Sequence, residues 1–454
     1  MYTYQDLLKV GESEKDKIQF TWNVIKEHQS SELYKNAQIA EEYRCRRNVT
    51  ITKYQKFLTK MTGEVVPDLI SANYKLPSNF YARFNTQLVQ YLLGNGISWN
   101  EESTSEKLGK DFESKMIKLA KEARTGGEAF GFWNLDHLEV FSLLEFAPLY
   151  DEEDGSMKAG VRFWRLAQEK PLRATLFELD GYTDYRWENG TGEVLNEKRP
   201  YVLNIKYTEQ GGDEIVDGEN YEAFPVIPLW ADDTKESPIV GIRESIDAYD
   251  LIKSGFCNTV DEASIVYWTV NNAGGMDDVD LAEFLKKIRT MHGAFTDDGA
   301  TAVPNTINAP HEGREALLDR IRSDLYEDAM ALDIKNISGG AVTATEIQAS
   351  YEPLNSKADD FEYEIIRFLD ELCRLIGIND EPTFTRSKIV NVQEEIDTIV
   401  TAAQYLNDEY VAKKILELLG DADKTEEVLS GLVEDRLMTY DREGTAETTG
   451  KETE

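Results

Sequence analysis

Side chains that could carry catalysis are abundant in this chain, but their spacing indicates no catalytic or metal site. Acidic residues number 85 against 49 basic ones, and no pair of carboxylates stands out as a general acid and base. Metal ligands and disulfides need cysteine or histidine at short, repeated spacings. The few present are far apart: Cys45, Cys257, Cys373, His28, His137, His292 and His311. We expect no metal, no cofactor and no disulfide framework.

Phosphate-binding and calcium-binding motifs are also missing. No GxxxxGK[ST] loop occurs, so the chain is not itself an ATP-driven motor. The run 126–131 lacks dinucleotide spacing, and the acidic run 151–155 lacks the distal glutamate of a calcium loop. A hydrolase stays an alternative, because Trp164, Tyr182 and Trp187 could stack on sugars beside two carboxylates. The pattern favours a protein that is not an enzyme.

The stretch from Asp333 to Gly377 has the most distinctive pattern. Gly339 and Gly340 let the chain bend sharply there. Thr343 and Glu346 have the spacing of a capping box that opens a helix, and Pro353 inside this helix should kink it. Apolar residues then recur on one face: Ile347, Tyr351, Leu354, Phe361, Ile365, Leu369, Leu372 and Leu375. The sequence predicts a polar, flexible loop carried by a long bent helix.

The elements before this stretch divide into helices and a sheet. Residues 1 to about 62 are predicted to be helical, with further helices from about 80 to 93 and 105 to 123. The basic cluster Arg44, Arg46 and Arg47 fits a salt-bridged surface better than a nucleic-acid patch. Between 126 and 226 the apolar period changes to two, with hairpin signals at Asp154-Gly155 and Asn189-Gly190. We expect an antiparallel meander packed on the preceding helices.

Two amphipathic helices flank a small module in the second half. The first begins at Ser237-Pro238, an N-cap followed by proline, and ends near 263; the second runs from 310 to about 332. Residues 265–309 between them are predicted to hold a strand over 265–270 and a short helix over 278–290. One antiparallel helix pair buries little by itself, so copies packed in a ring would cover what remains.

The C-terminal part is predicted to be a small helical bundle. A capping box at Asn391 and Glu394 opens one helix, and others follow at about 408–419 and 424–437. Residues 438–454 have almost no aliphatic side chains and are expected to be a disordered tail.

The net charge of −36 argues against a simple nucleic-acid binder, which would carry a basic face. It is compatible with a solvated acidic surface, or with a channel through which DNA slides without being held. No run approaches the roughly 20 apolar residues of a membrane span, and the start does not resemble a signal peptide.

Four stretches resemble the portal proteins of long-tailed phages, and they occur along this chain in the same order as in that family. The run 336–351, from Asn336 to Tyr351, resembles their tunnel loop and tunnel helix. The others are 85–96, then 127–131 with 150–155, and finally 246–255. Together they span about residues 80 to 376, and their order carries more weight than any single motif.

The resemblance implies a multi-domain α+β portal fold that assembles as a ring of twelve subunits. It assigns a wing to 1–236, stem helices to 237–264 and 310–332, and a clip to 265–309. The tunnel loop and long kinked tunnel helix take 333–377, a helical crown 378–437 and the acidic tail 438–454. The implied function is a channel at a capsid vertex through which double-stranded DNA is packaged and ejected.

In that family the tunnel loop lines the channel and touches DNA. The resemblance therefore implies that Lys335, Asn336 and Ser338 contact the DNA backbone without sequence preference, with Gly339 and Gly340 as hinges. Alternatively, Lys335 pairs with Asp333 or with an acid of a neighbouring subunit. Implied partners are the terminase, the head-completion adaptor, scaffold and major capsid protein, with assembly in the bacterial cytoplasm and residence in the virion. A head–tail adaptor or another ring-forming virion protein stays an alternative.

Overall fold

The computed structural model describes residues 2–11, 13–60, 62–69, 71–207, 213–263, 267–271, 286, 301–305, 311–337, 344–387, 396, 399–419 and 428. The chain divides into two compact units. One comprises 1–340 with 349–386, and the other comprises 341–348 with 387–454.

Four helices begin the first unit: α1 Tyr4–Val10, α2 Glu14–Ser30, α3 Glu32–Arg44 and α4 Val49–Lys53. The prediction of helix up to residue 62 is wrong beyond α4. There β1 Phe57–Thr59 and β2 Val65–Pro67 form an antiparallel hairpin, with Gly63 at φ 82° in its turn. Strands of three residues are too short to show an alternating pattern in the sequence.

The next helices lie close to their predicted positions. α5 spans Phe80–Leu93, as expected, and β3 Ile97–Trp99 follows it. The single helix expected over 105–123 is instead two, α6 Glu102–Leu108 and α7 Phe112–Gly126. Gly109 separates them at φ 86°, a backbone conformation that no helix contains.

The predicted antiparallel meander is confirmed. Its strands are β4 Glu128–Asn134, β5 His137–Ser142, β6 Phe146–Tyr150, β7 Met157–Trp164, β8 Leu172–Glu178, β9 Gly181–Glu188, β10 Thr191–Arg199, β11 Val202–Tyr207, β12 Asp213–Glu219 and β13 Val226–Trp230. They form sheets of order β10-β9-β8-β7-β6 and β13-β4-β5, and the pair β11-β12. Asn189 and Gly190, both at positive φ, form the two-residue turn between β9 and β10. The turn at Asp154-Gly155 is longer than predicted, since six residues separate the paired Tyr150 and Met157.

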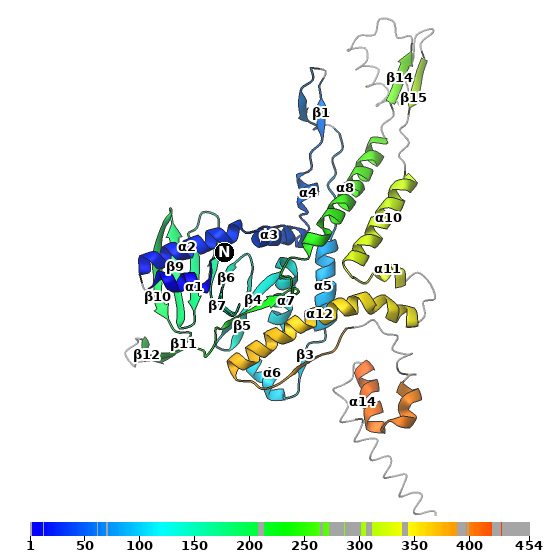
Figure 1. Ribbon diagram of the computed structural model, residues 1–454. Coiled ribbons are helices and arrows are strands. Elements are labelled where there is room, and N and C mark those ends of the chain that lie inside the picture. Colours follow the sequence, from blue (N-terminus) through cyan, green and yellow to red (C-terminus); the bar gives the residue numbers. More distant parts are fainter. Residues whose placement is uncertain are drawn as a thin grey trace, which may run out of the picture. The chain divides into compact units, whose positions relative to one another are not determined.

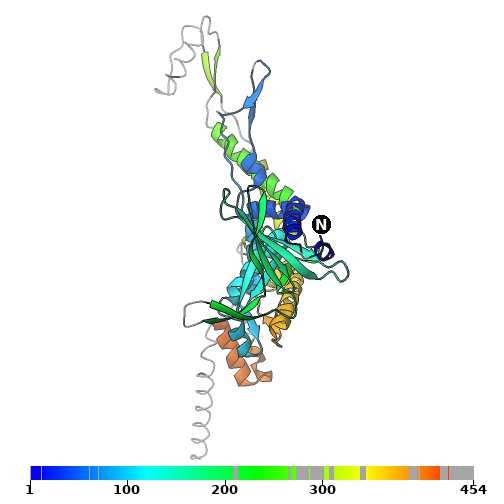
Figure 2. The same cartoon turned by 90° about the vertical axis from the view of Figure 1, so that its left-hand side faces the viewer.

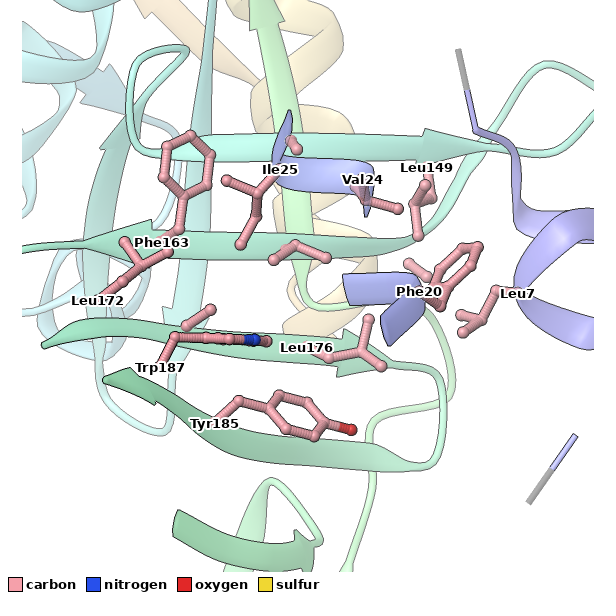
Figure 3. Packing of buried hydrophobic residues seen from close by; sticks show 14 of the residues in the cluster. Leu7, Phe20, Val24, Ile25, Leu149, Phe163, Leu172, Leu176, Tyr185 and Trp187 are labelled. Carbon is pink, nitrogen blue, oxygen red and sulfur yellow. The ribbon is translucent and has the colours of Figure 1, made fainter. Parts of the chain in front are cut away.

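The five-stranded sheet packs its buried face on the N-terminal helices. Alternate residues of β9 point inward, so Tyr185 and Trp187 are buried and their neighbours are less so. Figure 3 shows Phe20, Val24 and Ile25 of α2 and Leu7 of α1 over this face. Trp187 thus belongs to the sheet core and is not a surface ring that could stack on a sugar.

Two long helices and a strand pair follow the sheets. α8 Ile239–Ala263 and α10 His311–Asp328 pack against each other, and β14 Tyr267–Asn271 pairs with β15 Thr301–Asn305 (Figure 1). α10 ends at 328, four residues earlier than predicted, and Met330 has a positive φ of 50°. The helix predicted over 278–290 lies outside the described residues except Lys286.

The remaining elements are α11 Ile334–Ile337, α12 Ala344–Ile376, β16 Pro382–Phe384, the 3-10 turn η1 Ala403–Tyr405 and α14 Asp408–Leu419. β16 pairs with β3. α14 matches the helix predicted over 408–419, whereas the cap at Asn391 and Glu394, nearly all of the helix 424–437 and the tail 438–454 lie outside the described residues. The α+β class is confirmed.

Candidate functional site

The short helix α11 carries Lys335 directly after the second long helix. Its position is fixed by Asp333, whose carboxylate accepts a hydrogen bond from the Lys335 backbone N–H at 3.1 Å. The same oxygen is 2.7 Å from Arg322 of α10, and the Asp333 side chain is only 8% exposed. Asp333 therefore joins α11 to α10 and is already paired with a cation.

The Lys335 ammonium lies near a different acid from the one the sequence suggested. Its Nζ is 3.5 Å from Asp319 Oδ1 of α10, and the two side chains are 66% and 70% exposed. A pair this exposed contributes less than about 1 kcal/mol. The side chain is accessible, and its contact with DNA stays a prediction.

Most of the predicted loop lies outside the described residues: Ser338, Gly339, Gly340, Thr343 and the side chain of Asn336. The predicted capping box is therefore untested. α12 begins at Ala344, directly after Thr343, and Glu346 in its first turn is exposed.

The segment between α10 and α11 is held by a side chain from α5. The Gln87 amide donates to the Leu332 carbonyl at 2.9 Å and accepts from the Leu332 N–H at 3.0 Å. Leu332 itself is buried. Two hydrogen bonds to one residue's main chain fix the point from which the chain leads to Lys335.

The long helix predicted over this stretch is confirmed, and one face of it is buried. Pro353 lies inside α12 and removes one backbone hydrogen bond there. The first five residues of α12, 344–348, belong to the second unit, and the remainder belongs to the first. The buried side chains in the remainder are Tyr351, Leu354, Ala358, Phe361, Ile365, Phe368, Leu369, Leu372 and Cys373.

Lys357 links this buried face to the end of α10. Its Nζ donates to the Ala329 carbonyl at 2.5 Å. Burial, with a smaller effect from the nearby Arg124 charge, lowers the pKa of Lys357 to about 7. Arg124 is itself 3% exposed, donates to the Ala231 carbonyl at 2.9 Å, and has its pKa lowered by burial. Neither cation has a carboxylate at salt-bridge distance within the described ranges.

Arg367 fastens the other end of α12 to the three-stranded sheet. Its guanidinium lies over the Trp230 ring at 3.8 Å and donates to the Pro228 carbonyl at 2.9 Å. It also pairs with Glu364 and Glu371 of its own helix. The planar group thus fixes α12 on β13 by stacking and hydrogen bonding together.

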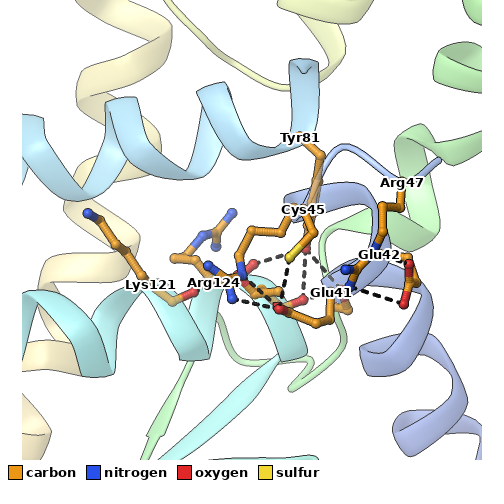
Figure 4. Close-up of polar contacts among 10 residues, drawn as sticks. Glu41, Glu42, Cys45, Arg47, Tyr81, Lys121 and Arg124 are labelled. Atoms are coloured by element: carbon orange, nitrogen blue, oxygen red, sulfur yellow. Dashed lines mark hydrogen bonds and ion pairs between the residues drawn. The ribbon is translucent and has the colours of Figure 1, made fainter. Parts of the chain in front are cut away.

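The basic cluster of the first half is a salt-bridged surface, as predicted. Arg44 lies 2.5 Å from Glu41 and Arg47 lies 2.7 Å from Glu42, while Arg46 donates to the Pro77 carbonyl. Figure 4 shows the Arg47–Glu42 pair beside Cys45. Arg44 and Arg47 are thus in salt bridges within the chain, and Arg46 contacts a main-chain carbonyl.

Sequence reasoning missed Gln87 and Lys357. Lys357 left a signal, since it follows Leu354 by three and precedes Phe361 by four, inside the apolar stripe. Gln87 left none, because its bonds go to a main chain 245 residues away.

Neither a metal site nor a membrane span is found in the part of the chain that is described. Its histidine, cysteine and carboxylate side chains form no group of three placed to hold an ion. Its helices include none that is long and apolar enough to cross a bilayer.

Comparison with known proteins gives a family match over most of the chain. Residues 23–430 match the family model described as phage portal protein, SPP1 Gp6-like. The portal protein of Clostridium phage phiCD119 is 21% identical over 361 residues, covering 72% of this chain and 78% of the relative. The portal protein of Bacillus phage SPP1 is 23% identical over 421 residues, covering 83% and 78%.

Two solved structures are also similar. One is described as the virion of a native gene transfer agent particle, with TM-score 0.45, 12% identity and coverage of 74% of this chain and 89% of that one. The other, the neck of that particle computed with C12 symmetry, has TM-score 0.44, 12% identity and the same coverage. Because both TM-scores lie below 0.5, the family assignment rests on the family-model match over residues 23–430.

Proposed function

The chain belongs to the SPP1 Gp6-like family of phage portal proteins, and from this premise we propose that twelve copies form a channel for double-stranded DNA. The protein is a portal subunit, a virion component of the ring at a capsid vertex. The match over residues 23–430 is the observation that carries the proposal.

Within the ring, the helices α8 and α10 are the stem and the residues between them the clip. The wing takes 1–236, the crown 378–437, and the tunnel loop with its helix 333–377. The support for this division is the order of elements: an N-terminal α+β part, two long packed helices around a strand pair, then a 33-residue helix.

The channel carries DNA inward during packaging and outward during ejection. The terminase and the head-completion adaptor dock at the clip, and scaffold and major capsid protein contact the wing. Assembly takes place in the host bacterial cytoplasm. These partners follow from the family, whose members are structural proteins and not enzymes.

The phosphate backbone of the DNA is contacted by Lys335, Asn336 and Ser338. The loop bends at Gly339 and Gly340, so it can stay in contact with the moving DNA. Two observations support this role for Lys335. Its side chain is 66% exposed, and Asp333 is already paired with Arg322. An ammonium this exposed can exchange a surface contact for a phosphate at little cost.

Ring formation is tested by native mass spectrometry and negative-stain microscopy of the purified full chain. A dodecameric ring is expected, and a monomer under capsid-assembly conditions would contradict the proposal.

The loop is tested by genome packaging in capsids built with portal variants. Gly339→Ala with Gly340→Ala should impair packaging while rings still assemble, because the loop loses backbone freedom. Lys335→Ala should lower retention of the packaged genome, and Lys335→Arg should preserve it because the charge remains. Normal packaging and retention in all variants would remove the loop from the mechanism.

A further inference from the structure

Residues 46–78, here termed the arm, are poorly covered by the rest of the chain. The arm comprises α4, the hairpin β1–β2 and the segment that returns to α5. Phe57 is 60% exposed, Val65 63% and Leu69 88%. A two-stranded hairpin with three residues in each strand is marginal in water by itself. The arm therefore needs a covering surface.

The return segment of the arm lies along one face of α8. Three side chains of α8 accept hydrogen bonds from its backbone N–H groups: Asp250 from Ser78 at 2.8 Å, Ser254 from Leu76 at 3.1 Å and Asn258 from Tyr74 at 2.7 Å. Their spacing of four places them on one face of the helix. These bonds hold the return segment of the arm along α8, while the side of the arm that faces away from α8 stays exposed.

α10 packs on the other face of α8. Phe256 contacts His311 at a ring distance of 5.4 Å, and Thr259 accepts a hydrogen bond from Arg314 at 2.8 Å. At about 100° per residue, Phe256 and Thr259 point roughly half a turn away from Asp250 and Ser254. Figures 1 and 2 show the arm alongside α8, and Figure 1 shows α10 on the opposite side.

The two flanks of α8 differ in charge. The arm has six basic and two acidic side chains, although the whole chain has 49 basic and 85 acidic residues. One of the six, Arg47, pairs with Glu42 outside the arm, and without it five basic and two acidic side chains remain. α10 has six acidic and three basic side chains. Glu312, Glu315 and Ala316 of its N-terminal half are exposed. They lie at the level of α8 where Asn258 binds Tyr74, because Arg314 reaches the next residue, Thr259.

We propose that in the portal ring the arm of each subunit lies against α10 of the next subunit. Tyr54 and Tyr74, 43% and 50% exposed, cover the helix surface around Ala316. Lys53 and Lys75 lie opposite Glu312 and Glu315. Two complementary surfaces on opposite sides of one helix make a head-to-tail contact, the kind that closes into a ring.

The occupant is a second copy of this chain because the acidic partner surface is present on every copy and at the matching level of α8. Placing the arm there would neutralise charge between subunits that each carry −36. The inference rests on the ring of the proposed function, and the experiment below separates the two.

The test is cysteine cross-linking of assembled rings with a short bismaleimide. Tyr74→Cys and Ala316→Cys are combined in a full-length background with Cys45→Ser and Cys257→Ser, since Cys45 is exposed and Cys257 is partly exposed. The Tyr74 hydrogen bond to Asn258 uses its backbone N–H, so the substitution leaves it intact. The expected result is a ladder of covalent multimers on a denaturing gel, with monomer alone for each single variant.

Other outcomes contradict one proposal or the other. Rings whose subunits stay uncross-linked, or link only within one chain to a fast-migrating monomer, would overturn the arm contact and leave the portal assignment standing. Absence of rings in the parent would instead count against the proposed function.

A charge exchange gives a second readout. Lys53→Glu and Glu315→Lys alone should each raise the subunit concentration for half-assembly by about threefold or more at low salt. The double variant should recover most of this loss, whereas additive losses would overturn the pairing. High salt should reduce the differences.

Discussion

The sheets between Glu128 and Trp230 and the arm beside α8 bury their apolar side chains to opposite extents. Between the three-stranded and five-stranded sheets, an aromatic cluster is formed by Phe130, Phe141, Phe146 and Phe177, none of them more than 4% exposed. In the arm, Phe57 is 60% exposed. The aromatic cluster is covered within one chain, whereas the proposed contact would cover the arm only on assembly. Substitutions at matched residue types can therefore separate folding of the subunit from formation of the ring.

The largest effect is expected for Phe146→Ala. Phe146 is fully buried, 4.5 Å from the Phe130 ring, and its loss should cost about 3–5 kcal/mol of unfolding free energy. Urea unfolding at one subunit concentration measures this cost. Phe57→Ala is the matched control, expected to change subunit stability by less than about 0.5 kcal/mol. Equal losses in the two variants would break the contrast between the regions.

The buried lysine of α12 gives a pH-dependent effect. Folding lowers the pKa of Lys357 from 10.5 to about 7, so between these values the unfolded chain binds a proton that the folded chain does not. The contribution of Lys357 to the free energy of unfolding therefore rises as the pH increases above about 7. Lys357→Met, which does not titrate, should be the more stable protein at pH 6.

That advantage should shrink by about 2–3 kcal/mol between pH 6 and pH 9. Denaturant unfolding of both proteins across this range measures it, and groups elsewhere cancel in the difference. An advantage independent of pH would mean that Lys357 keeps its proton throughout. Lys335→Met, at an exposed lysine, is the matched control for replacing a lysine by methionine.

A smaller effect is expected for Arg367→Lys. Lysine keeps the charge but loses the planar stacking on Trp230 and cannot reproduce the guanidinium's several directed bonds. We expect about 1 kcal/mol of destabilisation with rings still formed, measured by thermal unfolding of the ring. A loss of stability as large as that of Phe146→Ala would contradict this expectation. It would show that the α12–β13 contact is as important to the fold as the buried core.

The smallest effect on stability is expected for Lys335→Ala. Its pair with Asp319 is exposed on both sides, so removal should change unfolding free energy by less than about 0.5 kcal/mol. The same variant lowers genome retention if Lys335 contacts phosphate. A large stability loss would instead assign Lys335 a role in holding α11 on α10.

Local patterns made much of the fold predictable. The apolar stripe of α5 predicted where this helix begins and ends, and Asn189-Gly190 predicted the tight turn between β9 and β10. Both features depend only on residues close together in the sequence. The short hairpin at Phe57 could not be read in this way, since three residues show no period. The charge of Lys335 was visible in the sequence, whereas its proximity to Asp319 depends on how α10 ends.

Gln87 binds only main-chain atoms of Leu332, and this has a consequence for how the two positions tolerate change. Any apolar residue of suitable size at 332 presents the same N–H and carbonyl, so Ile or Met there keeps both bonds. At 87, glutamate loses the donor and leucine loses both bonds. Saturation mutagenesis should therefore find that position 332 tolerates several apolar residues, whereas position 87 tolerates almost none besides glutamine. The two positions differ in this way although their residues are hydrogen-bonded to each other.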